Sequence, residues 1–258
     1  MKDRREEWFD PEKKVAVTIV DVTEAAQTLA RGHLAGPTSA YYLTQALAAA
    51  ALIGAETSEP DEVVSLQMKC SGPLGGLAVE CTSEGKLRGY TEKKILDEFD
   101  GMGRPKDKAV LGDTQYQVTR SVPGRILSQG ISSSLDGYLA GSLQRKAVIF
   151  TEASVSDEVE ILEARGVLVE ELPDAKSTGA LAVRLAKLAR ASRTLLGELG
   201  LDRAELKRTS PLGFACRCSP ERAVTMLGAL SDGERATLPP TLDITCHMCG
   251  KTYTVKTR

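Results

Sequence analysis

Near the end of the chain, residues 214–219 read FACRCS and residues 244–250 read ITCHMCG. These two stretches hold four cysteines in the pattern C-x-C and C-x-x-C: Cys216, Cys218, Cys246 and Cys249. Four thiolates at such spacing can bind one zinc ion tetrahedrally, at a zinc–sulfur distance of ~2.3 Å. The same thiols can also be oxidised to disulfides. The pattern therefore predicts a metal site that oxidation can dismantle.

The cysteine pairs lie in a small C-terminal unit that we predict to span residues 211–258. Ser219 is suited to cap the helix that SPERAVTMLGAL predicts, and LDITCHMCGKTYTV is typical of two strands joined by a metal knuckle, with Gly250 at its tight turn. So small a unit buries little apolar surface, whereas ligation of structural zinc contributes ~10 kcal/mol or more to folding. We therefore expect the unit to fold only with its metal. His247 is not an expected ligand, because four thiols already complete a tetrahedron.

A leucine-rich segment, residues 176–210, precedes this unit and is predicted to be an amphipathic helical linker. Five leucines at helical spacing form its predicted apolar face: Leu181, Leu185, Leu188, Leu195 and Leu199. Gly197 and Gly200 each disfavour a helix by up to ~1 kcal/mol relative to alanine, so we expect a break near them. The segment is either a connecting helix docked on the core or a linker whose apolar face becomes exposed when its support is lost.

The first part of the chain, residues 1–175, is predicted to form an α+β core. An alanine-rich helix is expected to begin at Thr38 or Ser39, as its N-cap, and to end near Gly54. Runs rich in β-branched residues predict strands at 15–23, 63–70, 76–82, 114–122, 146–154 and 166–173. The stretch KLRGYTE, 86–92, continues the strands at 63–70 and 76–82 as a β-meander. The glycine-rich turn GPLGG joins two strands rather than a strand and a helix, so the sequence carries no nucleotide-binding fingerprint. The irregular order of helices and strands favours an α+β fold over a doubly wound sheet.

Composition narrows the classes of function. The chain is 42% hydrophobic and has 33 basic and 35 acidic residues. Its N-terminus, MKDRREEWFDPEKK, lacks the apolar region of a signal peptide, and its longest apolar run, 47–55, is too short to span a bilayer. We expect no membrane partner and a cytoplasmic location, where clustered thiols stay reduced and indicate a metal or redox site. Cys70 and Cys81, which are isolated in the sequence, are interpreted as small buried hydrophobes.

Several stretches together resemble the family of the redox-regulated chaperone heat-shock protein 33. The resemblance is carried by FACRCSPERAVTMLGAL and ITCHMCGKTYTV, supported upstream by GVLVEELP and by SGPLGGLAVECTSEGKLRGY, all in the family's order. The two cysteine pairs are its most specific part. The chain departs from the family at residues 138–147, YLAGSLQRKA, where the family usually carries a Ser-Glu-Gln step on a helix.

The resemblance implies a function and a set of roles. Members of the family hold one Zn²⁺ on the four cysteines when reduced and are then poor chaperones. Oxidation would join Cys216 to Cys218 and Cys246 to Cys249, release the ion and loosen the linker. The oxidised form, commonly a homodimer, would then bind unfolding client proteins without ATP. The leucine face of the linker is our candidate for part of the client-binding surface, and no enzymatic activity is expected.

Three other interpretations remain open at this point. A zinc ribbon that binds nucleic acid would use the same ligands, but residues 201–258 hold only nine basic and six acidic residues, too small an excess for such a surface. A thiol oxidoreductase would place its C-x-x-C at the start of a helix, whereas Cys246 and Cys249 lie between predicted strands. A zinc staple with no switching role has the same ligand spacing. We therefore expect no nucleic-acid partner, and the redox-regulated chaperone is the preferred interpretation.

Overall fold

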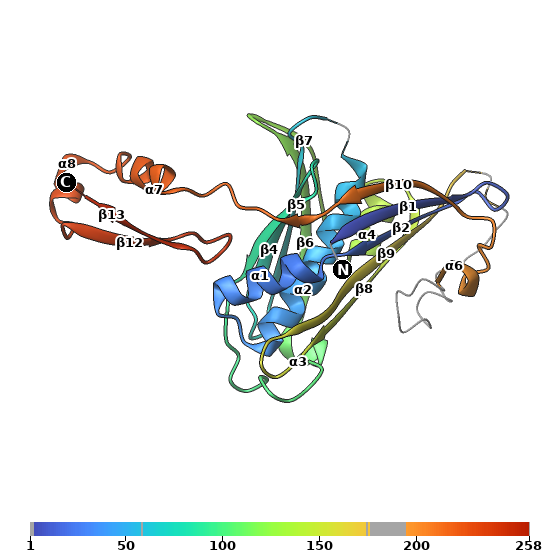
Figure 1. Ribbon diagram of the computed structural model, residues 1–258, viewed down its shortest axis with the longest axis horizontal. Helices are drawn as coiled ribbons and strands as arrows, with labels where there is room; N and C mark the ends of the chain where they lie inside the picture. Colours follow the sequence, from blue (N-terminus) through green and yellow to red (C-terminus); the bar gives the residue numbers. More distant parts are fainter. Residues whose placement is uncertain (1–2, 58, 174, 176–194, 258) are drawn as a thin grey trace.

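The computed structural model describes residues 3–57, 59–173, 175 and 195–257. Its described strands form a five-stranded sheet, a six-stranded sheet and a two-stranded hairpin, and helices lie between and beside them (Figure 1). This mixture confirms the predicted α+β class. Among the described helices, none combines the length and the apolar composition needed to cross a bilayer.

The five-stranded sheet is antiparallel throughout and unites the two ends of the core. Its strands, in spatial order, are β10 (Glu205–Pro211), β1 (Arg4–Asp10), β2 (Val15–Asp21), β9 (Ile161–Glu171) and β8 (Lys146–Val155). The pairing of Arg4 with Pro211 and of Phe9 with Glu205 fixes the register of β1 and β10. The sheet therefore joins the first strand of the chain to the strand that leads into the cysteines.

The six-stranded sheet contains the predicted meander. Its strands, in spatial order, are β11 (Gly213–Phe214), β5 (Lys86–Thr91), β4 (Gly76–Thr82), β3 (Val63–Cys70), β6 (Thr114–Val122) and β7 (Arg125–Ser132). Strands β3, β4 and β5 pair in antiparallel order, which confirms the meander. The short β11 pairs in parallel with β5, through Gly213 opposite Lys86. Because the C-x-C pair follows β11 directly, this edge of the sheet positions it.

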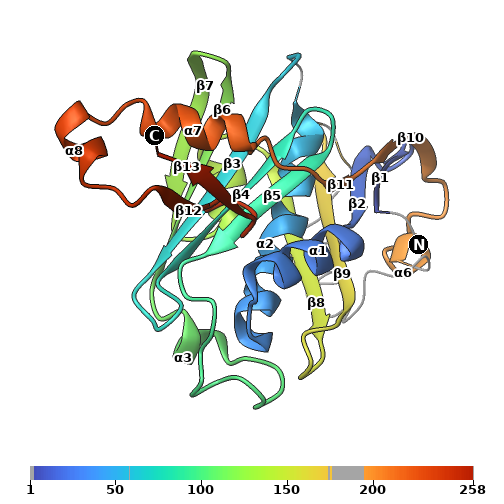
Figure 2. The same cartoon turned by 60° about the vertical axis from the view of Figure 1, so that its left-hand side comes forward.

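Helix α2 (Pro37–Ile53) is enclosed between the two sheets, as Figures 1 and 2 show. Every residue of this helix except Pro37 and Gln45 is buried, as expected for a helix that is hydrophobic all round. Close packing requires a small residue on the facing strand. A Cβ at Gly166 of β9 would lie 2.9 Å from the Cδ1 atom of Leu52. The alanine-rich middle of the helix thus forms the centre of the main core.

Two distant carboxylates cap the paired helices of the core. The prediction that Thr38 or Ser39 caps α2 is wrong, because Gly36 is the N-cap and Oδ1 of Asp100 accepts a hydrogen bond of 2.9 Å from the backbone of Thr38. The preceding helix, α1 (Thr23–His33), is capped by Asp3, whose carboxylate accepts bonds of 2.8 and 2.7 Å from the first-turn amides at residues 24 and 25. Both caps depend on tertiary structure, so local sequence does not reveal them.

The segment around the predicted linker differs from the expected helix. Within the described residues, helix α6 covers Leu195–Glu198, and Gly200, with φ +68°, follows it in a left-handed turn. The chain then enters β10, so the prediction of helix through residues 205–210 is wrong. The reason is non-local, because the polar and mostly exposed residues of β10 are held as a strand by pairing with β1.

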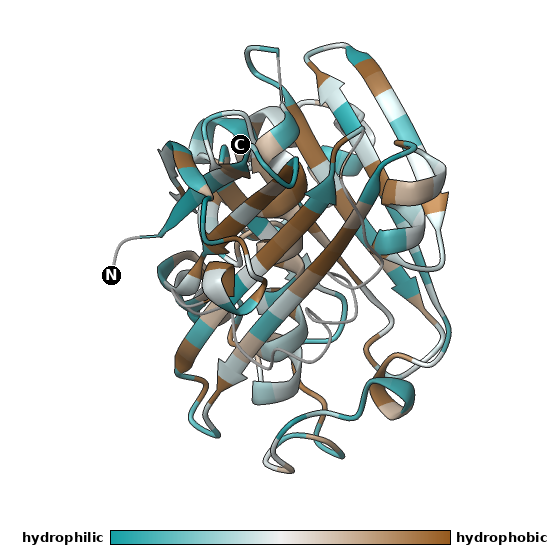
Figure 3. Cartoon of the chain, turned by 90° about the vertical axis from the view of Figure 1, so that its right-hand side faces the viewer, coloured by the Kyte–Doolittle hydropathy of each residue, from teal (hydrophilic) through white to brown (hydrophobic). Residues whose placement is uncertain are grey.

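The predicted leucine face is only partly within the described residues. Leu181, Leu185 and Leu188 lie outside them. Leu195 and Leu199 are each 1% exposed and pack against the valines of β2 and β9 in a second apolar cluster. Figure 3 shows the alternation of hydrophobic and hydrophilic residues along the strands on this side of the molecule. These two leucines are therefore covered in the described state.

The C-terminal unit is small and has a core of its own. It contains α7 (Pro220–Leu227), α8 (Asp232–Ala236) and the hairpin of β12 (Thr241–Thr245) and β13 (Thr252–Lys256), and it projects from the sheets in Figure 1. Ser219 caps α7 by accepting a bond of 3.2 Å from the backbone of Arg222, as predicted. Only Ala223, Leu227 and Val255 are buried in its apolar cluster. This core is too small to leave the unit much stability without a further constraint.

Three short helices complete the described elements. They are η1 (Gly54–Glu56), α3 (Asp107–Val110) and α4 (Leu135–Gly141). Helix α4 packs against β8 and begins after Ser134, whose side chain accepts a bond of 3.0 Å from the backbone of Gly137. The carboxylate of Asp136 in its first turn accepts a bond of 2.8 Å from the backbone of Ile149 in β8. This contact marks the outer edge of the five-stranded sheet.

Candidate metal and redox centre

Four cysteines from two separate segments converge on one point. The segment after β11 supplies Cys216 and Cys218, and the turn between β12 and β13 supplies Cys246 and Cys249. Their four sulfur atoms all lie within 4.8 Å of one another. Sγ of Cys216 is 3.7 Å from Sγ of Cys246, and Sγ of Cys218 is 3.5 Å from Sγ of Cys249. The fold therefore brings both pairs into a single cluster.

The geometry of this cluster fits a tetrahedral metal ion. A zinc ion at ~2.3 Å from each of four sulfurs separates neighbouring sulfurs by about 3.8 Å. The two cross-pair separations, 3.7 and 3.5 Å, are close to this value. All four cysteines are free thiols in the structure, and four soft sulfur ligands favour zinc over magnesium or calcium. The described residues contain no other group of three or more metal-ligating side chains within reach of one ion.

The C-x-x-C turn has the backbone of a metal knuckle. The amide of Cys246 donates a hydrogen bond of 2.8 Å to the carbonyl of Lys251, and the amide of Gly250 donates one of 2.9 Å back to the carbonyl of Cys246. Gly250 has φ +75°, in the left-handed region where glycine has no steric penalty. A Cβ there would also lie 2.0 Å from the carbonyl oxygen of Gly32. Two independent reasons therefore require glycine at this position.

Two side chains outside the predicted site contact the sulfurs. The hydroxyl of Tyr253 lies 3.2 Å from Sγ of Cys218 and donates a bond of 3.3 Å to the carbonyl of the same cysteine. Nη1 of Arg88, a residue of β5, lies 3.8 Å from Sγ of Cys216. Arg88 is itself oriented by a 2.6 Å ion pair with Glu80 of β4. Hydrogen-bond donors in this second layer commonly strengthen metal binding by thiolates.

The environments of the thiols differ. Burial opposes ionisation of Cys216, but the backbone of Cys218 and the Arg88 guanidinium outweigh it and lower the pKa of Cys216 to about 7. Burial raises the pKa of Cys249 and that of Cys246. Cys216 is also the cluster residue that borders a cavity of about 570 Å³ on the outer face of β3, β4 and β5. A small solute in this cavity can therefore reach Cys216.

The knuckle docks directly on the core. The amide of Gly89 in β5 donates a bond of 3.1 Å to the carbonyl of Met248, and a Cβ at Gly32 in α1 would lie 2.7 Å from the carbonyl oxygen of Cys249. The ring of His247 packs edge-on against Tyr90, with centroids 4.1 Å apart. On the other segment, the amide of Ala215 donates a bond of 3.1 Å to the carbonyl of Leu87. The cysteine cluster is thus held against β5 and α1.

The structure separates the cluster from the other two cysteines. Cys81 is fully buried in the main core, where burial raises its pKa to about 12, and Cys70 packs partly buried against the same core. Neither belongs to the cluster. Sequence reasoning missed Arg88 and Tyr253, because their contacts with sulfur depend on how the two segments fold together. It also missed Gly32, which allows the close approach of the knuckle.

Comparison with known proteins gives consistent similarities. A family profile described as Hsp33 protein matches residues 5–256. The 33 kDa chaperonin of Thermus thermophilus is 28% identical over 93% of this chain and 79% of its own length. The 33 kDa chaperonin of Symbiobacterium thermophilum is 27% identical over 92% of this chain and 88% of its own length. A crystal structure of the 33 kDa chaperonin (Heat shock protein 33 homolog) of Thermotoga maritima superimposes with a TM-score of 0.87, covering 100% of this chain and 96% of that one at 18% identity. This last similarity concerns the fold.

Proposed function

Because this chain belongs to the Hsp33 family of chaperones, we propose that it is an ATP-independent holdase whose activity is controlled by the redox state of its four-cysteine cluster. The observation that carries the proposal is the convergence of four sulfurs within 4.8 Å in a unit with a very small apolar core. A unit of this kind depends on its crosslink for stability. Any reaction that removes the crosslink therefore changes the conformation of the unit.

In the reduced state, the four cysteines would hold Zn²⁺ as thiolates, assisted by the hydroxyl of Tyr253 and the guanidinium of Arg88. Bound zinc would supply one tetrahedral crosslink between the C-x-C and C-x-x-C segments. Support for this metal comes from the sulfur separations of 3.7 and 3.5 Å and from the sulfur-only set of ligands. The reduced protein would be the inactive form, with the knuckle docked on β5 and α1.

In the oxidised state, the four cysteines would form two disulfides, Cys216 with Cys218 and Cys246 with Cys249. To form each disulfide, two thiolates lose one electron each. These two electrons, together with two protons, reduce one hydrogen peroxide molecule to two water molecules. Formation of both disulfides therefore consumes two hydrogen peroxide molecules. Disulfides that close such short loops constrain little of the unfolded chain. They also leave the two segments without a link to each other. The unit would then lose its crosslink, release the metal and undock from the core.

The activated protein would bind unfolding client proteins through newly exposed apolar surface. The leucine face of residues 176–210 is a candidate for part of that surface, with Leu195 and Leu199 covered until activation. We propose a homodimer as the oxidised assembly and the cytoplasm as the location. We also propose that the chain has no enzymatic activity, because four thiolates leave a bound zinc ion no open position for a substrate.

The proposal is tested by following zinc and chaperone activity together. Reduced, zinc-loaded protein is treated with hydrogen peroxide or hypochlorite while a chromogenic chelator reports free zinc and light scattering reports aggregation of a heat-denatured client. We expect loss of thiols, release of zinc and then suppression of aggregation. The variant Cys216→Ser/Cys218→Ser should lose this sequence of events, whereas Cys70→Ser, outside the cluster, should keep it. Equal client protection before and after oxidation would instead indicate a structural staple.

A further inference from the structure

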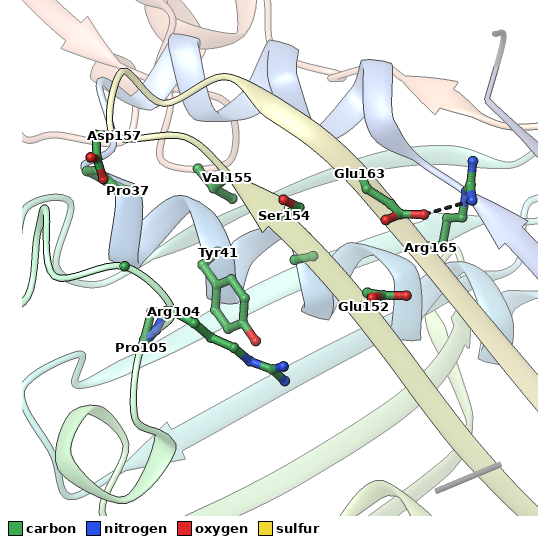
Figure 4. Close-up of a pocket in the computed structure, with 12 residues that line it drawn as sticks. Pro37, Tyr41, Arg104, Pro105, Glu152, Ser154, Val155, Asp157, Glu163 and Arg165 are labelled. Atoms are coloured by element: carbon green, nitrogen blue, oxygen red, sulfur yellow. Dashed lines mark ion pairs between the residues drawn. The ribbon is translucent and has the colours of Figure 1, made fainter. Parts of the chain in front are cut away.

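A cavity of about 560 Å³ lies beside strand β8, and none of the four clustered cysteines lines it (Figure 4). One wall is four consecutive residues of β8, 152–155. Loop residues 103–105 form the opposite wall, and Pro37 and Tyr41 at the start of α2 form the floor. Figure 4 shows the side chains of Tyr41 and Arg104 beside the ribbon of β8. The cavity is therefore a groove that follows the outer edge of the five-stranded sheet.

The hydrogen-bond pattern shows which backbone groups face this groove. The amide of Leu172, next to the end of β9, donates to the carbonyl of Lys14, next to the start of β2. Successive residues of an antiparallel strand form backbone hydrogen bonds alternately to one neighbouring strand and to the other. Even-numbered residues of β9 therefore bond to β2, and odd-numbered ones bond to β8. In the register of β8 and β9, Phe150 lies opposite Val167, so even-numbered residues of β8 bond to β9. The amides and carbonyls of its odd-numbered residues point outward. The amide of Ile149, which binds the carboxylate of Asp136, follows this rule.

Beyond that contact, the outer edge of β8 has no strand beside it among the described residues. The amides and carbonyls of Ala153, in the wall of the groove, and of Thr151, just beyond its end, point outward along this edge. A β-bulge between Ser154 and Val155 ends the regular ladder there. The edge therefore offers up to four backbone hydrogen bonds, two donated and two accepted, in the alternating order that an extended chain satisfies.

The walls of the groove suit a polypeptide better than a small metabolite. Proline, tyrosine, alanine and valine side chains supply its apolar surface, at Pro37, Tyr41, Pro105, Ala153 and Val155. Charges of both signs lie at its rim, with the cation Arg104 on the loop and the anion Asp157 beyond β8. This combination accepts varied side chains and selects none strongly. The one repeated feature along this edge of β8 is its row of outward backbone donors and acceptors.

We propose that this groove and the adjoining edge of β8 bind an extended segment of a client polypeptide, which pairs with β8 at Thr151 and Ala153 as an additional strand of the five-stranded sheet. Backbone pairing gives affinity without sequence selectivity, which a holdase for many clients requires. The inference rests on the proposed function for the nature of the partner. It does not depend on the cysteines, because the groove is built entirely from residues of the core.

The direct test is amide hydrogen exchange on the oxidised wild-type protein, with reduced and carboxymethylated lactalbumin as a permanently unfolded probe. Added probe should slow exchange of the Thr151 and Ala153 amides. Amides of Val148 and Phe150, already bonded to β9, should not change. Because the test requires no substitution, it is independent of any effect of mutation on folding.

A pair of variants tests the same contact by affinity. Proline at an edge position whose amide points outward leaves the inner ladder intact. Ala153→Pro removes one of the exposed donors and places its ring in the groove, so we expect about fivefold to tenfold weaker probe binding. Ala147→Pro makes the same change at an outward position of β8 that does not line the groove, and its affinity should equal that of wild type. Circular dichroism and thermal melting verify that both variants are folded.

The outcomes separate this inference from the proposed function. If client aggregation is suppressed but the amides of Thr151 and Ala153 are not protected from exchange by the probe, the assignment of the groove as a client-binding site is overturned. The proposal that the chain is a holdase then still stands. If the probe protects these amides from exchange but client aggregation is not suppressed, the groove is supported as a binding site for extended polypeptide. The proposed holdase function is then refuted. Equal weakening by Ala153→Pro and Ala147→Pro would also overturn the assignment, since the groove would then not be the site affected.

Discussion

The docking of the cysteine knuckle on helix α1 gives a quantitative prediction. Gly32 in α1 and Gly250 in the knuckle approach so closely that neither position has room for a methyl group. A Cβ at Gly32 would lie 2.7 Å from the carbonyl oxygen of Cys249, and a Cβ at Gly250 would lie 2.0 Å from the carbonyl oxygen of Gly32. Both obstacles are backbone atoms, which no rotamer change can move. Either substitution must therefore push the knuckle away from the core.

The expected loss in the free energy of docking differs between the two substitutions. Gly32→Ala disturbs the contact and weakens the adjacent bond from Gly89 to Met248, a loss of ~1 kcal/mol or about fivefold in the ratio of docked to undocked protein. Gly250→Ala adds a left-handed backbone penalty of ~1–2 kcal/mol, for a total of ~2–3 kcal/mol. Alanine at Gly32 also favours the helix by up to ~1 kcal/mol. Global stability can consequently rise in Gly32→Ala while docking weakens.

The measurement must therefore report docking rather than melting temperature. Exchange of the Gly89 amide in reduced, zinc-loaded protein is the suitable probe, because this amide donates its hydrogen bond across the contact. We expect exchange to accelerate about fivefold in Gly32→Ala and more in Gly250→Ala. The matched control is Gly233→Ala, in the same C-terminal unit, where an added Cβ meets nothing within 4 Å. If Gly32→Ala exchanges no faster than this control, the close contact does not limit docking and the reasoning is refuted.

Further predictions concern the cluster and the distant caps. Arg88→Gln removes the guanidinium beside Cys216 and should weaken zinc binding about tenfold in a chelator competition, whereas an unchanged affinity would show that the 3.8 Å contact has no role. Tyr253→Phe removes the hydroxyl beside the thiol of Cys218. In the same competition it should weaken the affinity for zinc by a smaller factor, equivalent to ~1 kcal/mol. Burial raises the pKa of Asp3 to about 6 from an ordinary value of 3.8, so its contribution to stability is present below pH 3.8 and lost as the pH rises through about 6. Urea unfolding of wild type and Asp3→Asn should therefore show the variant gaining relative stability between about pH 4 and pH 6, and a constant difference would contradict the assignment.

Local patterns in the sequence predict the central elements well. The strands β3, β4 and β6 are confirmed because their apolar alternation and flanking glycines are local signals. The convergence of the two cysteine pairs also follows from a short-range rule, since C-x-C and C-x-x-C are spacings that a single ion can bridge. The capping of α7 by Ser219 is a third local signal, and it is confirmed.

The features that the sequence does not reveal are non-local. Strands β1 and β10 are rich in charged residues and resemble solvated segments, yet each is stabilised by pairing with the other across almost the whole chain. The caps from Asp3 and Asp100 come from outside their helices. The contact of Arg88 with Cys216 joins a strand of the core to the C-terminal unit. Each depends on two remote segments meeting, which periodicity and spacing do not encode.

The pairing of β1 with β10 also has a consequence for biosynthesis. A ribosome makes β1 long before its partner on one side, Glu205–Pro211. During translation β2 can pair with β1 on the other side, while the edge meant for β10 stays open. Long-range strand pairing of this kind folds slowly and exposes unpaired edges to aggregation. A chain that we propose to protect other proteins thus passes, while nascent, through a form that itself needs protection.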